Sequence, residues 1–204
     1  MSNPTHSPLR LSTGAYVTTA EQSRWSHKAP RLIEIVPLTP TIGAEIAGVD
    51  LSQPLSDDVR QEIQDALLNH QVVFFRGQHL SPEALKAFGR QFGQLTTHPI
   101  QPTRIEGHPE IRVVHADENS RTVTGEVWHS DLSCAAEPPM GSILHAIEVP
   151  PYGADTLFAN QALAFATLSP GMQRMLRGLD AVHSARDAYS PKMQRMLRGL
   201  DAVH

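Results

Sequence analysis

Val127-Trp128-His129-Ser130-Asp131-Leu132 lies at the centre of a region that we expect to form a sheet. Its valine and tryptophan are typical of a strand. Side chains alternate along a strand, so His129 and Asp131 would point to the same side. An imidazole and a carboxylate on one face are two of the three protein ligands of a facial non-haem Fe(II) site.

The segments around this stretch predict a largely β region. Four short β-rich runs are separated by prolines and glycines, which end strands. The runs are residues 111–114, 126–133, 142–149 and 155–160. Closely spaced strands of this kind indicate a sandwich or a barrel.

Helices are predicted on both sides of the β region. Serine is a good helix N-cap, and proline or aspartate suits the first turn that follows it. These signals predict helices after Ser56, Ser81 and Ser169. A domain over residues 31–189 is therefore expected, after a flexible leader rich in Ser, Thr and Pro over residues 1–30.

The C-terminal segment contains a duplication. Residues 172–183 recur letter for letter as residues 193–204. Structural repeats diverge and usually occur three times or more. We therefore interpret the tail, residues 190–204, as a duplication or sequence-assembly artefact, and a functional tandem helix is the alternative.

Composition excludes several classes of protein. The 204 residues carry a net charge of -4 and no run of Lys or Arg, so nucleic acid and membranes are not expected partners. Cys134 is the only cysteine, which excludes an intramolecular disulfide. With no signal peptide and no long apolar stretch, a cytoplasmic location is expected. Homo-oligomerisation is left open.

The pair His129 and Asp131 is a weak signal by itself. A chain with this many histidines and aspartates contains His-x-Asp by chance about as often as not, and an exposed polar pair is then the simpler interpretation. The downstream sequence reverses that balance. In order follow Pro138-Pro139-x-Gly141-Ser142-Ile143-Leu144 and Pro150-x-x-Gly153-x-Asp155-Thr156-Leu157-Phe158.

Together these motifs resemble the central segment of the taurine dioxygenase family (TauD/TfdA type) of Fe(II)/2-oxoglutarate-dependent dioxygenases. The similarity covers roughly residues 31–189 and includes upstream segments around Gly43, Phe75 and Gly93. It implies a mainly β fold with flanking helices, the double-stranded β-helix or jelly-roll. It also implies an enzyme that uses O2 and 2-oxoglutarate to hydroxylate a small anionic substrate, with release of succinate and CO2.

The resemblance assigns roles to individual residues. His129 and Asp131 match the first two iron ligands of the family, and Thr156 matches the residue that hydrogen-bonds a 2-oxoglutarate carboxylate. Positions expected to contact the substrate are His98, Gln101, Leu132 and Cys134.

Several of these roles have simpler alternatives. Thr156 also fits a strand threonine, and His98 a solvated loop histidine. Gln101, Gly125 and Cys134 replace the tyrosine, asparagine and phenylalanine of taurine enzymes. The expected substrates are therefore a sulfonate, a sulfate ester or an aryloxyalkanoate, and taurine itself is disfavoured.

In this family the third iron ligand is a histidine far downstream of the pair, and an arginine follows it. His145, His183 and His204 do not match that position. We therefore expect the jelly-roll to be C-terminally incomplete in this chain, and residues 1–204 alone to be inactive, because a facial site needs three protein ligands. A non-catalytic jelly-roll module and a hydrolytic metalloenzyme are the competing interpretations.

Overall fold

A computed structural model describes residues 32–97, 104–120, 125 and 127–184, together with three two-residue strands. These strands are β1 (Leu9–Arg10), β2 (Tyr16–Val17) and β9 (Ala202–Val203). The chain divides into two compact units. Unit 1 comprises Met1–His79 and Pro150–Gly178, and unit 2 comprises Leu80–Val149 and Leu179–His204.

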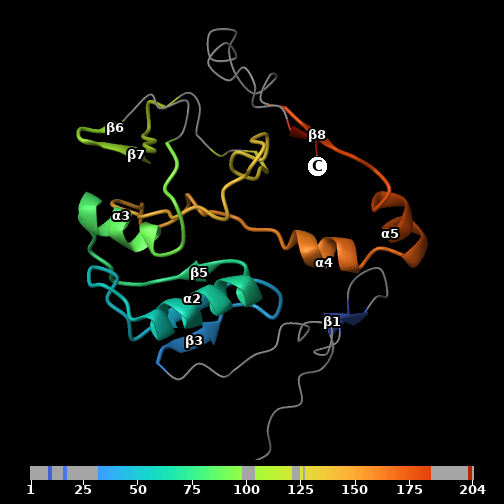
Figure 1. Ribbon diagram of the computed structural model, residues 1–204, viewed down its shortest axis with the longest axis horizontal. Coiled ribbons are helices and arrows are strands. Elements are labelled where there is room, and N and C mark those ends of the chain that lie inside the picture. The colour runs from blue at the N-terminus through green and yellow to red at the C-terminus, as the bar shows by residue number, and fades with distance from the viewer. Residues whose placement is uncertain are drawn as a thin grey trace, which may run out of the picture. The chain divides into compact units, whose positions relative to one another are not determined.

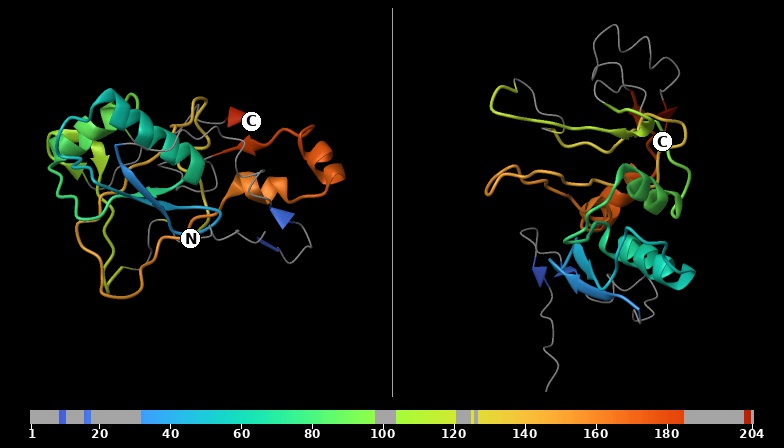
Figure 2. Two further views of the ribbon diagram at one scale, coloured as in Figure 1. Left: turned by 90° about the horizontal axis from the view of Figure 1, so that it is seen from below. Right: turned by 90° about the vertical axis from the view of Figure 1, so that its left-hand side faces the viewer.

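Unit 1 is built on a three-stranded sheet in the order β3-β4-β5. Strands β3 (Glu34–Pro37) and β4 (Ala44–Ala47) pair antiparallel, and β5 (Val73–Phe74) pairs parallel with β4. Parallel neighbours need a long crossover connection. Helix α2 (Asp57–His70) supplies it and lies against β4 and β5 (Figures 1 and 2).

The core of unit 1 is formed by the apolar faces of β4 and α2. Ala44 and Ile46 are 0% and 2% exposed, and Ile63 of α2 is 2% exposed. Ser56 caps α2, since its Oγ accepts a hydrogen bond from the Val59 amide at 3.3 Å. The helix therefore begins at a cap and is held in place by burial of one face.

An asparagine attaches the later part of unit 1 to the sheet. Asn160 Oδ1 accepts a hydrogen bond from the Leu163 amide at 2.8 Å, which caps helix α4 (Gln161–Ala166). Its Nδ2 donates to the Thr41 carbonyl at 2.7 Å. Phe158 adds an edge-on contact with Phe74 of β5, with ring centres 6.2 Å apart. The segment before α4 is thus held at two points, the loop between β3 and β4 and strand β5.

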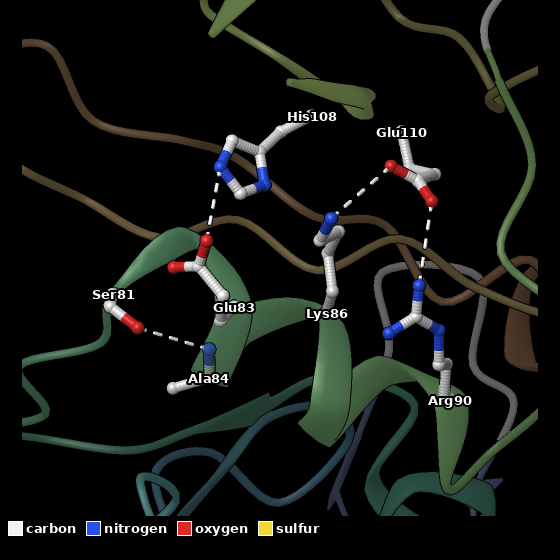
Figure 3. A network of polar contacts seen from close by, with 7 residues as sticks. All are labelled: Ser81, Glu83, Ala84, Lys86, Arg90, His108 and Glu110. Carbon is white, nitrogen blue, oxygen red and sulfur yellow. Dashed lines mark hydrogen bonds and ion pairs between the residues drawn. The ribbon is translucent and has the colours of Figure 1, made fainter. Parts of the chain in front are cut away.

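Unit 2 contains helix α3 (Pro82–Arg90) and the hairpin β6 (Arg104–Ile105) and β7 (His108–Arg112). Charged side chains join the helix to β7 (Figure 3). Glu83 Oε1 lies 3.2 Å from His108 Nε2. Glu110 forms two ion pairs, one from Oε2 to Lys86 Nζ at 3.6 Å and one from Oε1 to the Arg90 guanidinium at 3.5 Å. Because Lys86 and Glu110 are only 13% and 22% exposed, solvent screens this pair incompletely.

The predicted helices are confirmed, with small shifts at their ends. Helices α2, α3 and α5 (Pro170–Leu176) form where the serine caps place them, whereas α4 begins at the Asn160 cap. Helix α5 ends at Leu176, and the Gly178 amide donates to the Met175 carbonyl at 3.1 Å just beyond it. None of the helices described is long and apolar enough to cross a membrane.

Three of the four predicted β runs do not form strands. The run at 111–114 overlaps β7, but the described part of residues 113–181 contains no strand. A strand needs a neighbour for its backbone hydrogen bonds. Without one, the apolar side chains of Leu144, Ile147 and Leu157 are 74%, 85% and 69% exposed. Over the described residues the chain is mixed α and β, so these residues by themselves do not show a mainly β chain.

The two ends of the chain are described only in part. Within the predicted leader, β1 pairs antiparallel with β2. Strand β8 (Val182–His183) lies in the first copy of the duplicated segment, and it pairs antiparallel with β9 in the second copy. The rest of residues 1–30 and of the tail 190–204 lies outside the described residues, so both predictions stand untested.

Acid should weaken unit 2 through Glu110. The pKa of this carboxyl lies below its ordinary 4.5, chiefly because its own backbone N–H donates to it and also because Lys86 and Arg90 are nearby, while desolvation opposes the shift. A carboxyl with a depressed folded pKa stabilises the fold above its unfolded pKa, and this stability is lost as the pH falls through the folded value. In urea titrations below pH 4.5, the wild type should lose stability more steeply than Glu110→Gln.

The matched control is Glu118→Gln, which changes an exposed carboxyl of the same unit. It should keep the wild-type dependence on pH. Parallel curves for wild type and Glu110→Gln would contradict the role given to Glu110.

Candidate metal centre

His129 and Asp131 lie beside each other in unit 2. The distance from His129 Nε2 to Asp131 Oδ1 is 3.3 Å, and the side chains are 50% and 54% exposed. Two groups that can each donate a lone pair therefore converge at a solvent-accessible point. Chemically, such a pair can form an ion pair when the imidazole is protonated, or it can hold a cation between the two atoms.

Hydrogen bonds on the outer side of each group determine which atoms converge. His129 Nδ1 lies 2.8 Å from the Val127 carbonyl, an acceptor, so Nδ1 donates to it, and in the neutral imidazole the lone pair then lies on Nε2. On the other side, Ser142 Oγ donates to Asp131 Oδ2 at 2.6 Å. Oδ1 is therefore the carboxylate oxygen that faces the imidazole.

This arrangement fits a divalent metal ion. Octahedral ions with bonds of about 2.1 Å hold adjacent donor atoms about 3 Å apart, close to the separation of these two atoms. Imidazole and carboxylate donors suit Fe(II). Among the residues that the structure describes, no group of three His, Cys, Asp or Glu side chains comes together, so the described residues offer two candidate ligands here.

The pair lies at the start of a turn, not in a strand. Residues 131–134 form a turn in which Leu132 has a left-handed backbone, with φ of 48°, and the Ala135 amide bonds to the Leu132 carbonyl at 2.9 Å. The predicted strand alternation is therefore the wrong reason for their proximity. Gly125 lies beside the His129 ring and has φ of 91°, a conformation that favours glycine.

The other predicted site residues are distributed over the chain. Leu132 and Cys134 are half-buried in the turn after Asp131. Thr156 is exposed in unit 1, on the segment that Phe158 and Asn160 attach to the sheet. His98 and Gln101 lie outside the described residues, so their predicted contacts with a substrate stand untested.

Sequence reasoning missed two groups that shape the pair, the Ser142 hydroxyl and the Val127 carbonyl. The bond from Ser142 to Asp131 spans 11 residues, so no local spacing rule reveals it. A backbone carbonyl is present at every position and carries no residue-specific signal. The only available hint for Ser142 was its place in the motif Gly141-Ser142-Ile143-Leu144.

A separate hollow in unit 1 contains none of the predicted site residues. It is lined by Val49, Asp50, Ser52, Gly77, Gln78 and His79. Hydrogen bonds from Ser52 hold the pKa of Asp50 below its ordinary value. The Gln78 amide joins the two loops of the hollow, accepting from the Leu51 amide at 2.9 Å and donating to the Val49 carbonyl at 3.1 Å. The polar groups of Asp50 and Gln78 in this hollow are therefore engaged in hydrogen bonds that hold the two loops together.

Comparison with known families agrees with the motifs. The sequence model described as "Taurine catabolism dioxygenase TauD, TfdA family" matches residues 34–202. This match spans most of the chain and covers parts of both units. The chain belongs to the TauD/TfdA family.

Individual relatives give the same result. An alpha-ketoglutarate-dependent sulfate ester dioxygenase of Pseudomonas putida is 35% identical over 76% of this chain and 52% of its own length. An alkylsulfatase of Acinetobacter baylyi is 36% identical over 74% of this chain and 47% of its own length. The chain thus spans about half the length of these relatives.

The fold of this chain is similar to that of a solved structure. The crystal structure of a taurine dioxygenase from Burkholderia xenovorans is 38% identical, with a TM-score of 0.69. The similarity covers 85% of this chain and 57% of that one. The elements described above therefore belong to a fold shared with taurine dioxygenases.

Replacement of Leu132 should show that the turn after Asp131 is strained. A left-handed residue with a side chain costs about 1–2 kcal/mol relative to one that avoids the clash, and glycine avoids it. Leu132→Gly should therefore be more stable than Leu132→Ala by about 1 kcal/mol, as measured by urea unfolding. Both variants lose the leucine side chain, so their difference isolates the backbone.

Leu144 provides the matched comparison, because it lies in the same unit and is not among the residues with positive φ. There the order should be reversed, with alanine the more stable. The same order at both positions would contradict a strained Leu132.

Proposed function

We propose that the protein containing this chain is an Fe(II)/2-oxoglutarate-dependent dioxygenase that hydroxylates a small anionic organic substrate. In this reaction 2-oxoglutarate becomes succinate and CO2, one oxygen atom of O2 enters succinate, and the other enters the substrate. The bound iron would supply the oxygen chemistry, and the protein would supply binding and orientation. Membership of the TauD/TfdA family supports this function.

One observation carries the proposal. His129 Nε2 and Asp131 Oδ1 converge at 3.3 Å, while their outer atoms are engaged by Val127 and Ser142. A merely structural ion pair would not need its tautomer and its carboxylate orientation to be set by two further groups. Ligands held in this way are typical of a metal centre.

We also propose that the complete protein forms a double-stranded β-helix. The similarity to a taurine dioxygenase structure supports this fold. The extended residues 142–149 and 155–160 carry exposed apolar side chains, among them Ile147 and Leu157, as expected of segments that pair with further strands. Thr156, in the second of these segments, is the proposed partner of a 2-oxoglutarate carboxylate.

The proposed substrate class is a sulfate ester, with sulfonates and aryloxyalkanoates as the other candidates. The names of the Pseudomonas and Acinetobacter relatives favour the first class. Hydroxylation of the carbon next to the ester oxygen gives an unstable intermediate that breaks into an aldehyde and inorganic sulfate. His98, Gln101, Leu132 and Cys134 are the residues proposed to contact the substrate.

Turnover tests this function most simply. The product of the full reading frame that contains this chain is incubated with Fe(II), 2-oxoglutarate, O2 and an alkyl sulfate, an alkyl sulfonate or 2,4-dichlorophenoxyacetate. Succinate should form with all components present, and fastest with the alkyl sulfate, together with an aldehyde. His129→Ala should lower the rate by at least about 100-fold, because loss of an outer-shell partner alone costs 10–100-fold.

His115→Ala is the matched control, because it removes an exposed histidine of the same unit and should leave the rate unchanged. Undiminished turnover by His129→Ala would contradict the proposal. Absence of Fe(II)-dependent succinate with every substrate class would favour the non-catalytic jelly-roll module.

A further inference from the structure

Ser142 makes a short hydrogen bond to the candidate metal ligand Asp131. Its Oγ donates to Oδ2 at 2.6 Å, within the range of bonds between a hydroxyl and a charged carboxylate. Such bonds are stronger than neutral ones. The contact joins the turn at residues 131–134 to an extended segment 11 positions further along the chain.

The bond restricts what the Asp131 carboxylate can do. This side chain is 54% exposed, so surrounding side chains do not enclose it. Rotation about its last bond would exchange the two oxygens, and only a directional contact opposes that rotation. With Oδ2 engaged by Ser142, the carboxylate presents Oδ1 alone toward His129 Nε2.

We propose that Ser142 is a positioning residue that holds Asp131 as a one-oxygen ligand. This inference rests on the proposed metal site. A carboxylate that binds through both oxygens occupies two coordination positions, whereas one that binds through Oδ1 occupies a single position. The serine hydroxyl therefore keeps a further position open for the cosubstrate and for O2.

The alternative is that Ser142 only stabilises the turn. The two roles differ in the property that changes when the hydroxyl is removed. A structural serine affects the free energy of unfolding and leaves metal geometry unchanged, while a positioning serine changes metal affinity and the ligand field. Ser142→Thr retains the hydroxyl and should behave like the wild type under the positioning role.

The test uses Co(II) alone, added to the product of the full reading frame without 2-oxoglutarate or substrate. Affinity is measured by calorimetry and coordination by the visible spectrum of the ion. Ser142→Ala should bind Co(II) about 10–100-fold more weakly, with an altered spectrum, whereas Ser142→Thr should keep the wild-type values. Ser130→Ala, which removes the exposed hydroxyl between the two ligands, is the matched control and should resemble the wild type.

The outcomes separate the role of Ser142 from the existence of the metal site. If wild type binds Co(II), His129→Ala abolishes binding, and Ser142→Ala binds with unchanged affinity and spectrum, the role of Ser142 is overturned and the metal site stands. If Ser142→Ala and Ser142→Thr weaken binding equally, the hydroxyl is not responsible and the role is also overturned. If His129→Ala binds Co(II) like the wild type, the proposed metal site itself fails.

Discussion

An extended segment becomes a strand only when a neighbour satisfies its backbone hydrogen bonds, and this requirement explains most of the structure described. In unit 1, β4 finds β3 on one side and β5 on the other, with α2 as the crossover. Each strand of this sheet has a neighbour. The sheet and α2 contain most of the buried apolar side chains among the described residues, including Ala44 and Ile63. Elsewhere, residues 142–149 form no strand, and apolar side chains such as those of Leu144 and Ile147 are exposed.

The candidate metal centre is held by a different kind of contact. No sheet ladder supports His129 and Asp131 within the described residues, and their positions depend on a turn and on two side-chain hydrogen bonds. Such contacts fix the positions of individual atoms but add little to the stability of the fold, because each hydrogen bond contributes a net free energy of only about 1 kcal/mol. Geometry at this site therefore depends on a few identifiable groups, and Ser142 is one that a single substitution can remove.

Much of the fold could be predicted from the sequence because its signals are local. Ser56 and Ser81 cap helices within three residues, and Pro82 opens α3 where its missing N–H costs little. The strands were less predictable, since β4 is only four residues long and its pairing is decided by distant segments. At positions 126–133, β propensity predicted a strand, but no partner strand is present among the described residues.

The sequence proposes residues for the candidate site but does not indicate their geometry. The motif around His129, Asp131 and Thr156 indicated the family, which the family comparison confirms. A leucine in the left-handed region is unexpected from propensity, so the turn at Leu132 was invisible in the sequence. The bond from Ser142 was invisible for the same reason as the sheet pairing, because it joins residues that only the folded chain brings together.

The central claim is that His129 Nε2 and Asp131 Oδ1 hold one metal ion. Anomalous diffraction from crystals of the full reading-frame product grown with Mn(II) tests it most directly. The account predicts one strong peak about 2.1–2.2 Å from both atoms, with Asp131 Oδ2 still bonded to Ser142. A peak bound elsewhere, or one equidistant from both Asp131 oxygens, would contradict it.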